Sequence, residues 1–144
     1  MELNATNWED YEKQFIAFLD SEDAKKDRGV VYFWKTKKPM KRLSGESRVF
    51  YIGETSRSFS ERYYPSSNWE IEHRYFDNHY RQYIEDYQAI SIEILKVSDH
   101  KKAEFEALNI FKELCGELPP LNYRSGSKAH SDRELEAIRS KIVD

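Results

Sequence analysis

The sequence RVFYIGETSRSFSERYYP, residues 48–65, joins a short apolar segment to a polar one at a glycine. Its branched and aromatic start predicts a strand over Arg48–Ile52 that breaks at Gly53. The hydroxyl-rich residues that follow predict a short capped helix, ended by Pro65. Because the ends of strands and the loops behind them often carry functional side chains, this junction is the first candidate for a functional site.

The composition is that of one folded, soluble domain. The chain has 144 residues, enough to bury a core of its own, and 15% of them are aromatic, which argues against disorder. Its one cysteine, Cys115, excludes an internal disulfide, and no apolar run approaches the roughly 20 residues that a membrane span needs. The first residues lack the basic start and apolar core of a signal peptide. We therefore expect a single cytoplasmic domain over 1–144 that does not enter a membrane.

The pattern of apolar residues along the chain predicts both strands and helices. Runs of branched and aromatic residues predict strands over 29–34, 48–52 and 89–97. Helical spacing predicts helices over about 7–20, after Gly53, and over 71–87, 101–115 and 131–144. The expected fold is α/β in the broad sense (α+β), with a small, mostly antiparallel three-stranded sheet flanked by helices.

Residues 35–47 are predicted to form the loop of a hairpin between the first two strands, because they contain Pro39 and Gly45. The loop begins with a basic run, KTKKPMKR, whose five cations are Lys35, Lys37, Lys38, Lys41 and Arg42. Such a run is usually a solvated surface, and a phosphate-binding interpretation depends on what the rest of the chain offers.

Two tyrosines, an arginine and two glutamates stand near the expected ends of strands and helices. Tyr32 and Tyr51 lie on paired strands, and Arg62 lies on the next helix. Glu104 and Glu106 lie on the helix after the third strand. Hydrolysis of a phosphodiester needs a base for water, a cation against the developing charge and a metal at the leaving group. Arginine and a carboxylate-bound Mg²⁺ supply the last two, and a tyrosine is the candidate base if nearby cations lower its pKa.

These residues belong to an ordered set of motifs. RGVVYFW carries Tyr32, FYIGET carries an intact YIG that begins at Tyr51, and Arg62 follows eleven residues later. The segment AEFEALNIFKELCGELPPLN then carries both glutamates and ends in Asn122. In this order, residues 29–122 resemble the GIY-YIG nuclease superfamily, and the two terminal helices lie outside the resemblance.

The resemblance implies a metal-dependent endonuclease that hydrolyses DNA phosphodiester bonds. It implies catalytic roles for Tyr32 and Tyr51, one of which would act on the attacking water or orient it. It implies that Arg62 stabilises the scissile phosphate and that Glu106 binds a single Mg²⁺ (or Mn²⁺).

The resemblance also implies supporting roles for Gly53 and Asn122. A glycine at the strand end lets backbone or substrate come close, and Asn122 would brace the site. Tyr32 stands one residue later than the family's pattern places its tyrosine, so the face of the sheet on which it lies depends on the strand register.

Alternatives remain for the metal ligand and for the function. Helix geometry favours Glu104, which falls deeper in the apolar stripe, whereas the motif favours Glu106. The domain either cleaves DNA or is a non-catalytic nucleic-acid-binding module on the same scaffold. As part of a nuclease, the cations of 35–42 would hold duplex phosphates without reading sequence. The aromatic-rich N-terminal helix offers an interface for a possible homo-oligomer.

Overall fold

An antiparallel sheet lies at the centre of the part of the chain that this computed structural model describes, residues 2–3, 8–63, 86, 90–122 and 132–143. Its strands are β1 (Glu2–Leu3), β2 (Val30–Lys41), β3 (Glu46–Thr55) and β4 (Ile90–Lys96), in the order β1-β4-β2-β3. The helices are α1 (Trp8–Leu19), α2 (Glu22–Lys25), α3 (Phe59–Tyr63), α5 (His100–Cys115) and α6 (Asp132–Val143). The predicted class, a small antiparallel sheet flanked by helices, is confirmed. The helix predicted over 71–87 lies outside the described residues apart from Asp86.

Two short elements, β1 and α2, have no counterpart among the predicted ones. β1 pairs with the start of β4 through only two residue pairs, too few to show an alternating pattern in the sequence. α2 lies in a polar segment that predicts a connector. It begins at Ser21, whose hydroxyl accepts a hydrogen bond from the backbone N–H of Ala24.

The hairpin of β2 and β3 is longer than predicted, and most of the expected loop over 35–47 is strand. The two strands leave only residues 42–45 as the turn. The hydrogen-bonded ladder between β2 and β3 is irregular after Trp34. In this irregular part, the side chain of Arg48 donates a hydrogen bond to the carbonyl of Thr36 at 2.7 Å. Pro39 is tolerated in β2 because it stands inside this interruption.

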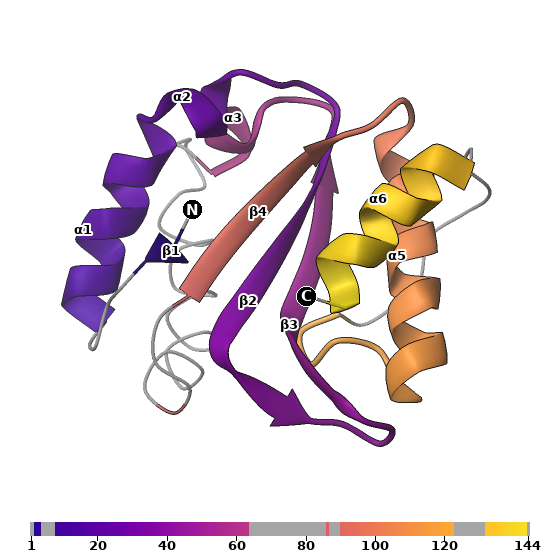
Figure 1. Cartoon of the computed structure of the whole chain (residues 1–144). Coiled ribbons are helices and arrows are strands. Elements are labelled where there is room, and N and C mark those ends of the chain that lie inside the picture. The colour runs from indigo at the N-terminus through magenta and orange to yellow at the C-terminus, as the bar shows by residue number, and fades with distance from the viewer. Residues whose placement is uncertain (1, 4–7, 64–85, 87–89, 123–131, 144) are drawn as a thin grey trace.

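The sheet separates two groups of helices (Figure 1). α1, α2 and α3 lie over one face, and α5 and α6 lie over the other. Alternate residues of β2 therefore belong to two different hydrophobic cores. Tyr32 and Trp34 pack with the aromatic residues of α1 and α3, whereas Val31 and Phe33 pack against α5 and α6.

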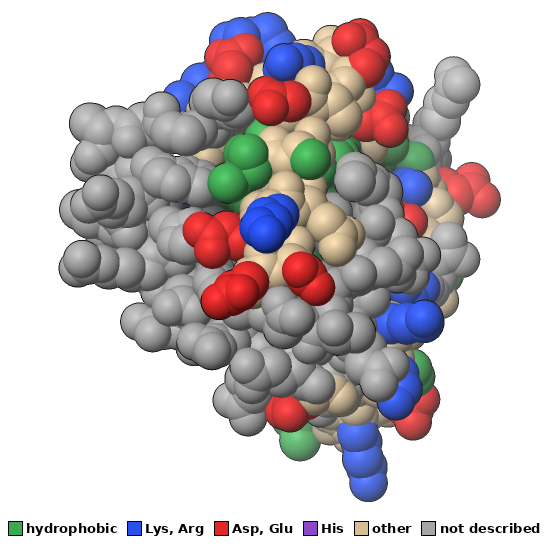
Figure 2. Space-filling model, turned by 90° about the vertical axis from the view of Figure 1, so that its left-hand side faces the viewer, with side chains coloured by type: hydrophobic (Ala, Val, Ile, Leu, Met, Phe, Trp, Pro, Cys, Tyr) green, Lys and Arg blue, Asp and Glu red, His purple; other side chains and the backbone are tan. Residues whose placement is uncertain are grey.

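The aromatic side chains of α1 belong to the first core. Tyr11, Phe15 and Phe18 are all buried there, so these three side chains are not available to an intermolecular interface. The exposed residues of α1 include Glu9, Asp10, Lys13, Ile16 and Ala17. The side of the molecule that carries α1 shows apolar and charged atoms intermixed (Figure 2).

α5 has a capping residue at each end. The side chain of Asp99 accepts from the N–H of Lys102 at 3.2 Å, and Gly116 ends the helix with a φ of +75°. His100 is thereby fixed in the first turn of α5. Among the helices that the structure describes, none is long and apolar enough to cross a membrane.

Candidate functional site

The two predicted tyrosines lie on the same face of the sheet. Tyr32 pairs with Gly53 across the hairpin, and Tyr51 pairs with Trp34. Because paired residues share a face and so do residues two apart, the rings of Tyr32 and Tyr51 are diagonal neighbours with centroids 6.4 Å apart. The irregular part of the hairpin begins only after Trp34 and leaves this arrangement intact.

Gly53 is needed because the ring of Tyr32 lies directly on its backbone. A Cβ atom at Gly53 would be 2.5 Å from two ring carbons of Tyr32. The close approach expected at this glycine is therefore made by a side chain of the same domain.

Tyr63 connects Tyr32 to Arg62. Its hydroxyl donates a hydrogen bond to the hydroxyl of Tyr32 at 3.2 Å, and both side chains are buried. The guanidinium carbon of Arg62 lies 5.2 Å from the centroid of the Tyr63 ring, a cation–π contact. A sequence does not show these two contacts, because it marks Tyr63 only as the neighbour of Arg62.

The environment of both tyrosines keeps their hydroxyls protonated. Burial raises the pKa of Tyr32, and Tyr51 raises it further. Burial also raises the pKa of Tyr51, and the negative charge of Glu104 adds to this effect. Arg62 lowers the pKa of both phenols, but burial outweighs it. Arg62 therefore lowers the pKa of each tyrosine as expected, but the net pKa shift of both is upward because of burial.

Glu104 is the carboxylate of α5 whose charge acts on the tyrosines. The tyrosines lie on the sheet face opposite the one that α5 covers, but the negative charge of Glu104 still raises the pKa of both Tyr32 and Tyr51. Glu106 is two residues further on, about 200° around the helix axis, and so points in nearly the opposite direction. The geometry favours Glu104, the alternative left open by the sequence, over Glu106 as the residue that joins this site.

Asn122 braces the backbone of β3 beside Tyr51. Its Oδ1 accepts from the N–H of Ile52 at 2.9 Å, and its Nδ2 donates to the carbonyl of Ile52 at 2.7 Å. The N–H of Leu121 donates to the carbonyl of Phe50 at 3.0 Å. Both neighbours of Tyr51 are thus held by the segment that follows α5.

A histidine–carboxylate pair lies where α5 meets β3. Nδ1 of His100 is hydrogen-bonded to Oε2 of Glu54, and each side chain is 25% exposed. Glu54 is close enough to Tyr51 to raise its pKa. The sequence gives no signal for this pair, because the two residues come together only when α5 packs on β3.

The five cations of the basic run differ in their surroundings. Lys35 lies in β2, not in a loop, and its ammonium is buried 2.7 Å from the carboxylate of Glu93. Arg42 is mostly buried and lies 2.7 Å from Glu117. The remaining three, Lys37, Lys38 and Lys41, are exposed. The sequence predicts that all five cations can contact the phosphates of a duplex, but of the five only these three are exposed enough to do so.

A metal ion at this site would depend on few protein ligands. Within the described residues, no group of three or more His, Cys, Asp or Glu side chains is arranged to hold a metal. Mg²⁺ commonly binds proteins through one or two carboxylates and fills its remaining positions with water and substrate phosphate. The single carboxylate of Glu104 beside Arg62 and two phenols fits that mode.

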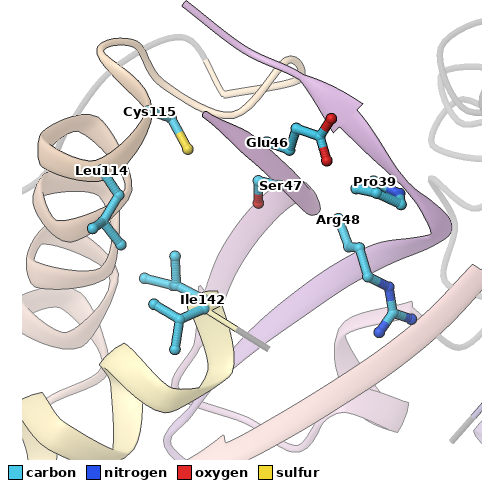
Figure 3. Close-up of a pocket in the computed structure, with 8 residues that line it drawn as sticks. Pro39, Glu46, Ser47, Arg48, Leu114, Cys115 and Ile142 are labelled. Carbon is cyan, nitrogen blue, oxygen red and sulfur yellow. The ribbon is translucent and has the colours of Figure 1, made fainter. Parts of the chain in front are cut away.

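One cavity lies away from the tyrosines. Its volume is about 410 Å³, and it lies between the hairpin and the ends of α5 and α6, with Ser47, Cys115 and Ile142 in its wall (Figure 3). None of the predicted site residues lines it.

Comparisons of the chain with models of known protein families, with curated proteins and with solved structures find no match. The site at the β3 edge, formed by Tyr32, Tyr51, Arg62 and Glu104, is therefore the basis for a functional assignment.

Proposed function

We propose that this domain is a metal-dependent endonuclease that hydrolyses phosphodiester bonds in DNA, of the GIY-YIG kind that residues 29–122 resemble. The observation that supports the proposal is that the rings of Tyr32 and Tyr51 lie 6.4 Å apart and that Arg62 lies against Tyr63, whose hydroxyl is bonded to that of Tyr32. Glu104 of α5 is near enough for its charge to raise the pKa of both phenols. A guanidinium, two hydrogen-bond donors and a carboxylate at one place suit a reaction that concentrates negative charge on a phosphate.

Arg62 stabilises the charge that develops on the scissile phosphate, with its guanidinium supported by the Tyr63 ring. Tyr51 is the more accessible of the two site tyrosines and donates its hydrogen bond to the phosphate or to the attacking water. Tyr32 is 1% exposed and lies behind Tyr51, where its hydrogen bond with Tyr63 keeps the phenols in place.

Glu104 would hold Mg²⁺ (or Mn²⁺), which supplies Lewis-acid stabilisation of the leaving oxygen when it is bound. One such site cuts one strand at a time. A double-strand break would therefore take two successive cuts or two copies of the domain.

The DNA-contacting surface of the proposed enzyme includes Lys37, Lys38 and Lys41 of the hairpin. β2 continues past Trp34 to Lys41, roughly 20 Å along the strand, so a duplex seated at the tyrosines extends over these cations. Such contacts hold phosphates and do not read bases. Lys35 and Arg42 are left out, because each is already paired with a carboxylate.

A non-catalytic nucleic-acid-binding module on the same scaffold is the second candidate function. It is favoured by the burial of Tyr32, whose side chain is 1% exposed.

Nicking of supercoiled plasmid DNA by the purified chain tests the choice. We expect nicking with Mg²⁺ or Mn²⁺ and none with a chelator, and losses of about 10²–10³-fold in Arg62→Ala and Glu104→Gln. Glu106→Gln is the matched carboxylate variant on the same helix. DNA binding without metal-dependent nicking would favour the non-catalytic nucleic-acid-binding module. A loss of nicking in Glu106→Gln but not in Glu104→Gln would identify Glu106 as the metal ligand.

A further inference from the structure

Leu43 is an exposed apolar residue in the turn of the β2–β3 hairpin. It is 79% exposed, a larger fraction than for the other exposed large apolar residues that the structure describes, Ile16, Leu114 and Val143. A single leucine on a surface is common and by itself needs no functional explanation. Leu43 differs in how its backbone is held and in which side chains surround it.

The turn that carries Leu43 is fixed to the C-terminal end of α5 (Figure 1). The N–H of Leu43 donates to Oε1 of Glu117 at 3.2 Å, and the N–H of Ser44 donates to the carbonyl of Cys115 at 2.9 Å. The guanidinium of Arg42 lies 2.7 Å from the carboxylate of Glu117. Because the backbone on both sides of Leu43 is held, its side chain stands on a rigid support, and little entropy is lost when it enters a partner.

The charged side chains that are exposed around Leu43 are mainly cationic. Lys41 lies two residues before Leu43 and pairs with Glu46 across the hairpin. The exposed charged residues between positions 37 and 46 are three lysines and one glutamate, namely Lys37, Lys38, Lys41 and Glu46. An apolar tip beside a net positive charge is complementary to duplex DNA, whose phosphates are anionic and whose stacked bases present apolar faces.

The shape of the hairpin also suits a duplex. Two-stranded ribbons enter the grooves of DNA in several classes of DNA-binding protein. Some proteins that bind the minor groove insert Leu, Ile, Met or Phe between two base pairs, which unstacks that step and kinks the duplex. A rigidly held leucine at the end of a ribbon has the chemistry and the position for such an insertion.

We propose that Leu43 is a wedge that enters a base step of duplex DNA and kinks it, while the exposed lysines of the hairpin contact the flanking phosphates. This inference rests on the DNA binding that is part of the proposed function. Tyr32 pairs with Gly53 at the opposite end of the hairpin from the turn. The kinked step is therefore not the step that is cleaved.

The test compares the affinity of the full chain for two duplexes of one sequence, in a chelator that prevents cleavage. One duplex is intact, and the other carries a short central bulge that unstacks and kinks it beforehand. Because the bulge removes the cost of the kink, the wild-type chain should bind the bulged duplex about tenfold more tightly than the intact one. In Leu43→Ala this preference should fall below about threefold, and in Leu43→Met, which keeps a wedge side chain, it should persist.

Ile16→Ala removes an exposed apolar side chain from α1 and serves as the control, which should keep the wild-type preference. Energy transfer between dyes at the two ends of the intact duplex measures the kink directly. It should rise on saturation with the wild-type chain or Leu43→Met, but not with Leu43→Ala.

Equal preference and equal energy transfer for the wild-type chain and Leu43→Ala would overturn the wedge and leave the proposed function intact. The exposed leucine would then belong to a protein contact or to none. Absence of duplex binding by the wild-type chain would overturn both proposals.

Discussion

Gly53 has no side chain, and this leaves room for the ring of Tyr32. The ring of Tyr32 occupies the space where a Cβ of Gly53 would be, and Phe59 and Tyr63 hold that ring from the other side through edge contacts at 5.1 and 5.7 Å between centroids. The ring therefore has no free space into which it could retreat. β3 continues through Gly53 to Thr55, so the predicted break of the strand at Gly53 is wrong, and the glycine is explained by packing within the domain.

Gly53→Ala should destabilise the domain by about 1–3 kcal/mol, the usual cost of forcing extra atoms into a packed core. Urea unfolding measures the loss. In a Tyr32→Leu background the added methyl has room, so the same change should cost much less. An equal cost in both backgrounds would contradict the contact between Gly53 and Tyr32.

The hairpin shows where sequence patterns mislead at the scale of an element. Pro39 and the run of cations predict a loop, yet β2 continues through them. Lys35 is accommodated in the strand because Glu93 on β4 neutralises it, and Pro39 because the ladder is interrupted beside it. Both reasons depend on partners far away in the sequence, which a local pattern does not contain.

Lys37→Glu together with Lys38→Glu should weaken binding to duplex DNA and flatten its dependence on salt. If each lysine contacts one phosphate, the slope of log K against log salt should fall by about two units. The pair Lys112→Glu and Arg139→Glu changes the net charge equally on α5 and α6 and serves as the control. Equal effects of the two pairs would show that the hairpin acts only through overall charge.

At the scale of the whole molecule, the sequence predicts the three main strands, α1, α5 and α6. It also predicts that Tyr32, Tyr51 and Arg62 lie near one another, because the motifs follow one another in the same order as the strands and the helix that carry them. It does not predict the protonated state of the phenols or the pairing of His100 with Glu54. Those properties arise only when the helices close over the two faces of the sheet.

Burial of several tyrosines predicts a domain that loses stability in alkali. The pKa values of Tyr11, Tyr32 and Tyr51 are raised in the folded chain above the ordinary value of about 10. Unfolding above that pH therefore releases protons, so the stabilisation is complete below about pH 10 and is lost as the pH rises further.

Unfolding temperatures between about pH 8 and pH 11.5 measure this effect. Tyr32→Phe removes one titrating group, so its unfolding temperature should fall less steeply above pH 10 than that of the wild-type chain. Parallel curves for the two proteins would exclude Tyr32 as a contributor.

The side chain of Asn122 has a consequence for how this domain behaves in a crowded solution. It occupies both hydrogen-bonding groups of Ile52 much as an adjacent strand would. An exposed sheet margin is a template on which a foreign chain adds and from which fibres grow. At Ile52 both backbone groups are already bonded to the Asn122 amide, so a foreign strand cannot pair with the sheet at this residue.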